Sequence, residues 1–319
     1  MKNREWYGYR AREIECERHY SVIDYGCEGK GMVTNYSLFE GIQITFLDFY
    51  TTEIFPSQKY DSDIIAINYC KRGRYECEFP NYTMAYLSEG YFSVNGTKYL
   101  PLSFSFPLQR YSGLSVVIDK KALIESVKQM MDIVPIDLDK IGNNLGLENG
   151  WYISKTPKKL EHIFTDIYQA HGIESEGYFK IKAMEILYHI DQLTQNRGCD
   201  FKYFDKGQIE STKRIKEYLV GHLEDNISLE QLVKEEHINL SLFYTIFSQI
   251  YGDTPYAYLK KYKMNLAAQM LMEGEQKIGD IAMKLGYHNA SKFSKAFVTV
   301  YGELPKDYRK RKKYKWAFS

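Results

Sequence analysis

Between residues 42 and 118 the chain alternates short apolar stretches with turn-forming residues. Four stretches are rich in β-branched and aromatic residues, and they read IIAINYC, YECEF, YTMAYL and YFSV. Turn signals separate them at Gly73, at Pro80 and Asn81, at Gly90, and at Asn95 and Gly96. Short strands at this spacing are typical of a β-sandwich or a β-barrel. We therefore predict a β-rich domain over residues 1–118, in which an N-terminal arm precedes the strands.

From residue 119 the apolar positions follow a helical period. The segment DKKALIESVKQMM predicts an amphipathic helix that begins at Asp119. A second helix is indicated by apolar residues at i, i+3, i+4, i+7 and i+8, namely Leu160, Ile163, Phe164, Ile167 and Tyr168. A third covers about 177–195 and ends in the sequence NRG. We predict a helical extension over 119–196 and then a linker over 197–206. The helices at 157–170 and 177–195 carry more apolar surface than one face of a barrel needs, so one of them forms either a dimer interface or a packing surface between domains.

From residue 207 onward the chain has the pattern of short helices joined by tight turns. Ile215, Leu219 and Leu223 share one face of the first helix. Ser228 is expected to start the next helix in a capping box, in which its hydroxyl accepts from the amide of Gln231 and the Gln231 side chain reaches back. A long helix follows over about 255–273. The pattern predicts an all-α domain over residues 207–319.

The segment 239–261 is repeated fifty residues later, at 289–311, with nine identical positions out of 23. The identical pairs are Asn239/Asn289, Ser241/Ser291, Phe243/Phe293, Phe247/Phe297, Tyr251/Tyr301, Gly252/Gly302, Pro255/Pro305, Tyr258/Tyr308 and Lys260/Lys310. The offset is 49 before the turn at residues 286–288 and 50 after it. An insertion inside a turn that keeps both flanking helices in phase indicates two helix-turn-helix units.

In each copy the second helix has an apolar face and a polar face. The apolar sets are Phe243, Ile246, Phe247 and Ile250, then Phe293, Ala296, Phe297 and Val300. The outward sets are Ser241, Tyr244, Thr245 and Ser248, then Ser291, Lys292, Ser294 and Lys295. The matching cores predict the same unit built twice. The different outward faces predict that the two helices read different bases in the major groove of DNA.

Residues 207–312 resemble the DNA-binding domain of the AraC/XylS family of bacterial transcription regulators. The signature positions lie in the second copy: Ile281, Ala282, Gly286, Tyr287, Phe293, Phe297, Gly302, Pro305, Tyr308 and Arg309. The resemblance implies seven helices, two helix-turn-helix units and a rigid linking helix. That helix would place both reading helices in successive major-groove segments roughly 34 Å apart.

The resemblance also implies which residues contact DNA. They are Ser241, Tyr244 and Thr245 in the first reading helix, and Ala290, Ser291, Lys292 and Lys295 in the second. Family members usually carry Arg and Lys where this chain has Thr245 and Ser248. That difference removes a phosphate contact and a guanine reader that contributes roughly 1–3 kcal/mol of discrimination. We therefore expect the second helix to supply more of the electrostatic affinity.

Charge is distributed unevenly along the chain. Residues 207–319 hold 18 Lys and Arg against 13 Asp and Glu, a net charge of +5, whereas residues 1–206 hold 24 against 28, a net charge of −4. The run RKRKKYK, which begins at Arg309, has six cations in seven residues. This balance favours a polyanionic partner at the C-terminal end, where the run either contacts phosphates or forms a solvated tail. The same two readings apply to Lys260, Lys261 and Lys263 on the linking helix.

The β-rich domain resembles the cupin-type barrel that many AraC/XylS members place before the DNA-binding domain. A metal cupin needs two or three His and a carboxylate, and residues 20–118 contain no His. Motifs for a nucleophile or a phosphate loop are also missing, so we expect no metal, no cofactor and no catalytic residue. The candidates for contacting a small effector inside the barrel are Asn68, Tyr69, Arg74, Tyr86, Phe92, Phe104 and Phe106. For most of these aromatic residues, ordinary core packing is the alternative.

No apolar run approaches the ~20 residues that span a membrane, and the N-terminus lacks the apolar region of a signal peptide. The five cysteines are scattered singly, which favours a reducing, cytoplasmic location without a membrane partner. We predict a sequence-specific regulator that binds double-stranded DNA and is controlled by a small effector in the barrel. By family resemblance it is an activator that contacts RNA polymerase, and a homodimer is expected. The alternatives are control by a partner protein, constitutive activity, and a cupin enzyme with a regulatory tail.

Overall fold

The computed structural model describes residues 7–8, 10–58, 61–80, 83–173, 176–193, 206–225, 227–273 and 276–316. The chain divides into two compact units, Met1–Lys202 and Tyr203–Ser319. The linker predicted over 197–206 lies outside the described residues except for Lys206, which begins a helix. Across the described ranges, no helix has both the length and the apolar character to cross a membrane.

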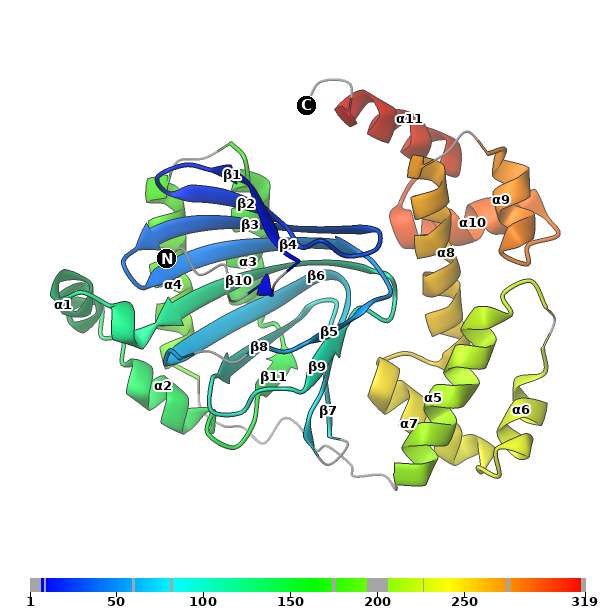
Figure 1. Cartoon of the computed structure of the whole chain (residues 1–319), viewed down its shortest axis with the longest axis horizontal. Helices are drawn as coiled ribbons and strands as arrows, with labels where there is room; N and C mark the ends of the chain where they lie inside the picture. The colour runs from blue at the N-terminus through cyan, green and yellow to red at the C-terminus, as the bar shows by residue number, and fades with distance from the viewer. Residues whose placement is uncertain are drawn as a thin grey trace. The chain divides into compact units, whose positions relative to one another are not determined.

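The N-terminal unit is built on an antiparallel sheet that curls into a half-barrel (Figure 1). Its main path runs β1-β2-β3-β4-β10-β6-β8-β11, while β7 pairs with β6, and β9 pairs with β5 and β6. The strands are β1 Arg12–Cys16, β2 Tyr20–Asp24, β3 Lys30–Phe39, β4 Ile42–Tyr50, β5 Ile54–Pro56, β6 Ile64–Glu78, β7 Met84–Ser88, β8 Tyr91–Gly96, β9 Ser103–Ser105, β10 Arg110–Asp119 and β11 Tyr152–Lys155. A curled β-sheet followed by helices confirms the fold class predicted for this half.

Three features of this unit differ from the prediction. Strands begin at Arg12, because β1, β2 and β3 pair in succession toward β4 and do not form a separate arm. The helix predicted to begin at Asp119 begins instead at Glu125. Asp119 pairs with Ile64 as the last residue of β10, and its side chain caps a short 3-10 turn at Lys120–Ala122. Strand β11, inside the predicted helical extension, pairs with β8. All three differences result from pairing between strands that are far apart in the sequence. The spacing of apolar residues within one segment does not reveal such pairing.

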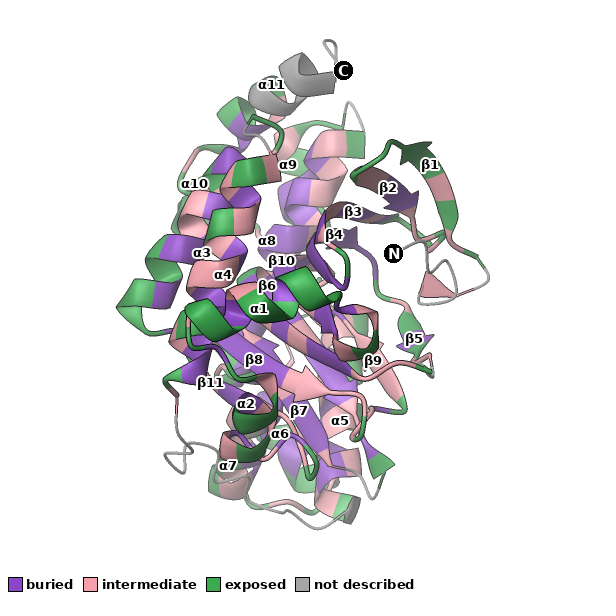
Figure 2. Ribbon diagram, turned by 90° about the vertical axis from the view of Figure 1, so that its left-hand side faces the viewer, coloured by how far each residue is buried: buried purple, intermediate pink, exposed green. Residues whose placement is uncertain are grey.

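Four helices follow the strands: α1 Glu125–Ile133, α2 Leu138–Asn144, α3 Lys158–Ala170 and α4 Glu176–Asp191. Ile44, Ile67 and Val116 of the sheet belong to the same core as the apolar residues of these helices. Tyr69 of β6 stacks on Phe164 of α3, with ring centres 4.5 Å apart. The apolar faces of α3 and α4 are therefore buried inside this unit (Figure 2).

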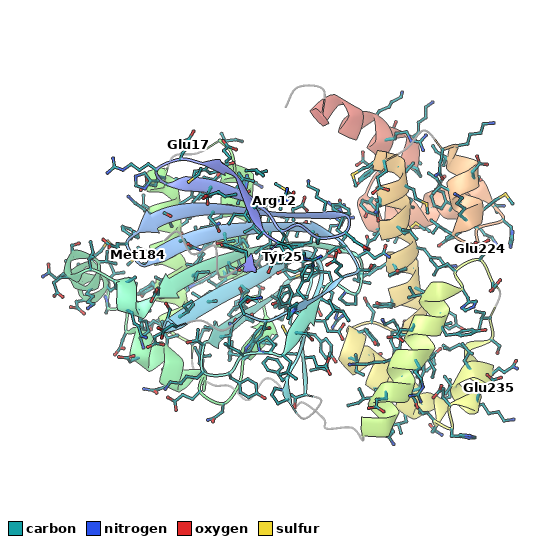
Figure 3. The ribbon with its side chains drawn as sticks, viewed as in Figure 1. Arg12, Glu17, Tyr25, Met184, Glu224 and Glu235 are labelled. Atoms are coloured by element: carbon teal, nitrogen blue, oxygen red, sulfur yellow. The ribbon has the colours of Figure 1, made fainter. Side chains whose placement is uncertain are left out.

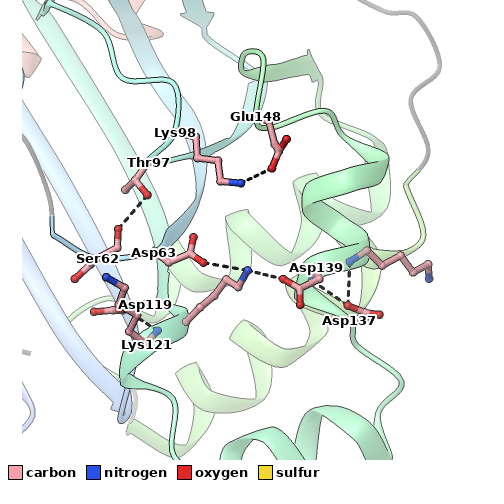
Figure 4. A network of polar contacts seen from close by, with 11 residues as sticks. Ser62, Asp63, Thr97, Lys98, Asp119, Lys121, Asp137, Asp139 and Glu148 are labelled. Atoms are coloured by element: carbon pink, nitrogen blue, oxygen red, sulfur yellow. Dashed lines mark hydrogen bonds and ion pairs between the residues drawn. The ribbon is translucent and has the colours of Figure 1, made fainter.

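Lys120 ties α2 to the sheet through the carboxylates of Asp63 and Asp139, which are labelled in Figure 4. Its ammonium lies 3.2 Å from Asp63, just before β6, and 2.5 Å from Asp139 in the first turn of α2. The lysine lowers the pKa of the Asp139 carboxyl. Asp137 caps the same helix by accepting hydrogen bonds from the amides of Asp139 and Lys140. These contacts fix one end of α2, although both pairs are exposed enough to add little stability.

The C-terminal unit is helical throughout its described residues. Its helices are α5 Lys206–Gly221, α6 Leu229–Glu235, α7 Leu240–Tyr251, α8 Pro255–Glu273, α9 Ile278–Lys284, α10 Ala290–Tyr301 and α11 Pro305–Trp316. Helix α8 contacts α5 and α7 on one side of the repeat and α9, α10 and α11 on the other. The pairs α6–α7 and α9–α10 therefore form two helix-turn-helix units joined by one helix, as predicted (Figure 1).

The two reading helices are capped by equivalent residues of the repeat. Asn239 and Asn289 each accept hydrogen bonds from the amides two and three residues ahead, at 2.8–3.2 Å. Gly252 and Gly302 end the helices with φ values of 70° and 75°, a backbone conformation that favours glycine. These identities in the sequence repeat therefore set where each reading helix begins and ends.

The capping box predicted at Ser228 is only half formed. The Ser228 hydroxyl accepts from the amide of Gln231, as expected. The Gln231 side chain donates instead to Glu235, one turn further along α6, at 3.2 Å. An acidic partner at i+4 competes with the return bond, because a charged acceptor forms the stronger hydrogen bond.

Candidate nucleic-acid interface

The same aromatic contacts hold both reading helices against the rest of the unit. In the first copy, Phe247 of α7 meets Tyr258 of α8 edge-on, with ring centres 5.5 Å apart. In the second copy, Phe297 of α10 meets Tyr308 of α11 in the same way at 5.4 Å. A third ring completes each cluster. The ring centre of Tyr251 lies 5.1 Å from that of Tyr258, and the ring centre of Tyr301 lies 5.0 Å from that of Tyr308. The two units therefore present equivalent faces of their second helices to solvent.

Helix α7 presents an uncharged outward face. Ser241 and Thr245 are exposed, and Tyr244 and Ser248 are half-exposed. The Thr245 hydroxyl donates to the carbonyl of Ser241 within the same helix, at 3.0 Å. This face offers hydroxyl groups and one aromatic ring to base edges, but it has no cation for a phosphate.

Helix α10 presents a cationic outward face. Ala290, Ser291, Lys292 and Lys295 are all exposed on it. The two lysines are three residues apart, so their ammonium groups project from the same side of the helix. Figure 3 shows the side chains of this unit. Of the two reading helices, α10 has the groups that can neutralise phosphates.

Three of the other predicted cations, Lys261, Lys263 and Arg309, have partners within the unit. Lys261 forms an ion pair with Asp253 at 2.9 Å. Lys263 donates to the carbonyl of Leu223 at 2.7 Å, and burial lowers the pKa of its ammonium. Arg309 donates through Nη2 to the carbonyl of Gln276 at 2.7 Å. Lys260 is half-exposed, and the side chains of residues 311–316 lie outside those described.

Lys263 lies where the first copy meets the second. Its ammonium lies over the ring of Tyr287, in the turn of the second copy, 5.7 Å from the ring centre. The neighbouring Gly286 has a φ of 73°, and a Cβ there would lie 2.5 Å from the Leu223 oxygen. The end of α5, the middle of α8 and the turn after α9 therefore meet at one point. This contact connects α5 and α8 to the turn of the second helix-turn-helix unit.

Residues 232–311 match the family model described as "Helix-turn-helix domain". The C-terminal unit is a helix-turn-helix domain of the AraC/XylS type. Among relatives, the transcriptional regulator LumQ of Photobacterium leiognathi is 31% identical over 33% of this chain and 44% of its own. XylDLEGF operon transcriptional activator 1 of Pseudomonas putida is 28% identical over 35% of each chain. AlkR of Acinetobacter baylyi is 36% identical over 26% of this chain and 28% of its own.

The matched part spans less than half the length of each of these relatives. A solved structure of ToxT from Vibrio cholerae covers 84% of this chain and 97% of its own, at 14% identity and a TM-score of 0.34. A TM-score this low supports no conclusion about shared function. The AraC/XylS-type assignment therefore rests on the C-terminal unit. The relatives are named as transcriptional regulators, which agrees with the expectation that the chain is not an enzyme.

The N-terminal unit contains a cavity of about 210 Å³ on the face of its sheet opposite the helices. Asn68, Phe104 and Phe106 of the predicted effector set line it. Tyr69 and Phe92 point to the other face of the sheet, in the core shared with the helices. The remaining pair, Arg74 and Tyr86, is also absent from the described lining. Arg74 is buried and lies over the Tyr86 ring at 5.2 Å, on the β6–β7 hairpin.

The predicted effector set lacks most of the polar residues that line this cavity, which include Gln43, Thr45, Ser93, Asn95 and Ser115. The signal that could have found them is strand alternation. In β4 and β10 every second residue joins the helix-facing core, and the residues between them face the cavity. Within the described ranges, no group of three His, Cys, Asp or Glu side chains is placed to hold a metal ion.

Proposed function

We propose that this protein is a sequence-specific DNA-binding transcriptional regulator whose two reading helices contribute unequally. The observation that carries the proposal is the pair α7 and α10, which share their caps and aromatic contacts but differ on their outward faces. The shared parts support a common mode of insertion into the major groove. The AraC/XylS-type relatives, one of them named as an operon activator, support activation.

The first reader, α7, recognises its segment through Ser241, Tyr244 and Thr245, mainly by hydrogen bonds and shape. The second reader, α10, uses Ala290 and Ser291 near its start and adds Lys292 and Lys295, which neutralise phosphates. Because electrostatic affinity depends on salt and shape readout depends on it less, the two readers differ in salt sensitivity. The proposal therefore assigns most of the salt-dependent affinity to the second half of the operator.

The deciding experiment compares Lys295→Ala with the unmodified chain on an operator found by genome-wide mapping of bound sites. Lys295→Ala should weaken binding on every sequence and reduce the slope of log K against log salt by about one. Lys128→Ala, an exposed lysine of α1 in the other unit, is the matched control for loss of charge and should leave the slope unchanged. Equal slopes for Lys295→Ala and the unmodified chain would rule out this role.

We also propose that a small effector bound in the cavity of the N-terminal unit controls the regulator. A cavity of about 210 Å³ inside a half-barrel, lined by aromatic side chains and a few polar groups, has the composition of a small-molecule site. Native mass spectrometry of the purified chain tests this directly. A bound small molecule supports effector control. Its absence, with a partner protein that co-purifies, favours control by that partner.

A further inference from the structure

Four polar residues of the cavity wall belong to a continuous row of polar side chains across the sheet. Strand pairing places Asn35 of β3 opposite Thr45 of β4, and Thr45 opposite Ser115 of β10. Ser115 is in turn opposite Asn68 of β6, and Asn68 is opposite Ser93 of β8. Five neighbouring strands therefore each contribute one uncharged polar side chain at the same level. The register of the sheet builds this row, so it does not depend on loops.

Hydrogen bonds link the members of the row to one another. Thr45 donates to the Asn35 side-chain oxygen at 2.8 Å, and Ser115 donates to that of Asn68 at 2.7 Å. Asn68 then donates to Ser93 at 3.2 Å. Gln43, one step along β4, donates to Thr45 at 3.2 Å, and its own Oε1 accepts no hydrogen bond from the described residues. The row is therefore held in fixed orientations and keeps acceptor capacity toward the cavity.

Core packing alone does not call for these side chains. On the opposite face, the same strands bury Ile44, Ile67, Phe92 and Val116. Burial of an amide or hydroxyl costs roughly 1–3 kcal/mol unless it is hydrogen-bonded, so an apolar row would be the simpler filling. At the level of the row, these strands carry polar residues only on the face that lines the cavity, which points to a ligand that forms hydrogen bonds there.

The wall of the cavity carries no formal charge among its described residues. It contains no Asp, Glu, Lys, Arg or His. Tyr111 is fully enclosed, and its burial raises the phenol pKa well above the ordinary value, so this hydroxyl stays neutral. An ionised carboxylate or ammonium would lose its hydration here without an opposite charge to replace it.

The other part of the wall is aromatic. Phe104 and Phe106 lie 6.1 Å apart, and Tyr75 stacks parallel to Trp151 with ring centres 6.4 Å apart. Tyr25, labelled in Figure 3, also lines the cavity. Flat apolar surfaces of this kind pack against the faces of rings or short hydrocarbon segments. A cavity of about 210 Å³ has room for a small ring with its substituents.

We infer that the cavity binds an uncharged ring compound that carries several hydroxyl or amide groups. Its polar groups meet Thr45, Ser115, Asn68 and Ser93, the members of the row that line the cavity, and its ring packs on the aromatic wall. The inference rests on the proposed effector control and specifies the chemical class of the effector. It excludes small carboxylates and amines as ligands of this site.

The test measures binding to the complete chain by calorimetry, with matched pairs of neutral and ionised probes. The neutral set contains aldopentoses, aldohexoses, cyclitols and nicotinamide, and the acid set contains uronates, benzoate and nicotinate. At least one neutral probe should bind at least ten-fold more tightly than its acid partner. Tighter binding of the acids, or no binding by any neutral probe, would overturn the inference.

A matched pair of variants locates the site. Ser115→Ala removes the hydroxyl that donates to Asn68, whereas Ser112→Ala removes one on the same strand that donates to Asp48 at 3.0 Å, away from the cavity. Ser115→Ala should reduce the affinity for the neutral probe at least five-fold, and Ser112→Ala should leave it unchanged. Equal losses in both variants would contradict the assignment. Operator binding measured without a probe separates this outcome from failure of the proposed function, because DNA binding does not require the cavity.

Discussion

Gly286 and Gly302 have nearly the same backbone conformation but different surroundings. Their φ values are 73° and 75°. A Cβ at Gly286 would lie 2.5 Å from the Leu223 oxygen and 3.2 Å from the Lys263 ammonium, whereas a Cβ at Gly302 meets nothing within 4 Å. The two glycines therefore separate the cost of a left-handed conformation from the cost of crowding.

Gly302→Ala should destabilise the C-terminal unit by about 1–2 kcal/mol, the ordinary cost of left-handed backbone in a residue with a Cβ. Gly286→Ala adds the displacement of a backbone carbonyl and should cost roughly 1–3 kcal/mol more. Hydrogen exchange of peptides from α9 and α10, followed by mass spectrometry, measures both. If amide hydrogens in α9 and α10 exchange at equal rates in the two variants, the crowding at Gly286 has no effect on stability.

His171, at the end of α3, should make the stability of the N-terminal unit depend on pH. Its ring lies 4.0 Å from that of Phe46, and burial lowers the imidazole pKa below its ordinary 6.5. Below pH 6.5 the unfolded chain binds a proton that the folded chain does not. Stability should therefore fall as the pH drops below 6.5 and should level off once the folded state also binds that proton.

Denaturant unfolding between pH 5 and pH 8 checks this dependence. His171→Gln should remove the part of the slope that belongs to this residue. His162→Gln, an exposed histidine on the same helix, is the control and should leave the slope unchanged. A steeper loss of stability in acid for His171→Gln than for the unmodified chain would contradict the assignment.

At single residues, the sequence predicted what a local pattern encodes. The apolar set Phe243, Ile246, Phe247 and Ile250 is fully buried, as its helical spacing required. Tyr69 and Phe92 were chosen for the cavity because they are aromatic, but strand alternation places them on the opposite face. Lys263 looks like a surface cation in the sequence, because no local pattern shows that the Leu223 carbonyl approaches it.

Among the elements, helix α8 joins the two readers and makes contacts with both copies. Its Lys263 connects the end of α5 to the turn that contains Tyr287. If this contact holds the two readers at one spacing, its loss should relax that spacing more than it weakens either reader. This expectation rests on the proposed DNA-binding function.

Lys263→Met should reduce the preference for the natural operator over one with a base pair inserted between the two contacted segments. The preference is expected to fall several-fold, because rigid positioning of the two readers penalises the altered spacing. Lys261→Met on the same helix breaks only the exposed pair with Asp253 and should keep the preference. Competition binding with the two operators measures the ratio, and an unchanged ratio in Lys263→Met would contradict the role.

The helices and strands differ in how far the sequence predicts them. Helices α7 and α10 carry their own start and stop signals in Asn239, Gly252 and their counterparts, so their positions follow from local chemistry. Strands β1 to β3 and β11 have short, mixed patterns, and they exist because neighbouring strands pair with them. Sheet membership is decided over long sequence separations, and one sequence does not show it.

At the scale of the whole molecule, the positive charge and the readers belong to the same unit. Residues 207–319 have a net charge of +5, and residues 1–206 have a net charge of −4. The C-terminal unit also has a buried core of its own, which includes Met264, Ile281, Phe293, Phe297 and Tyr308. Folding and phosphate contact should therefore both survive separation from the N-terminal unit.

A fragment of residues 203–319 should fold and bind the operator with the salt dependence of the complete chain. The slope of log K against log salt counts neutralised phosphates, and Lys292 and Lys295, the cations proposed to neutralise them, lie in the fragment. The fragment should lose any response to a ligand of the N-terminal cavity, because the described residues that line the cavity all lie outside it. The salt dependence is measured in place of the affinity, because a second binding unit in the complete chain would raise the affinity by avidity without new contacts.

Circular dichroism checks the fold of the fragment, and a salt titration of operator binding checks the slope. A fragment that folds but shows a shallower slope would mean that the N-terminal unit contacts DNA itself.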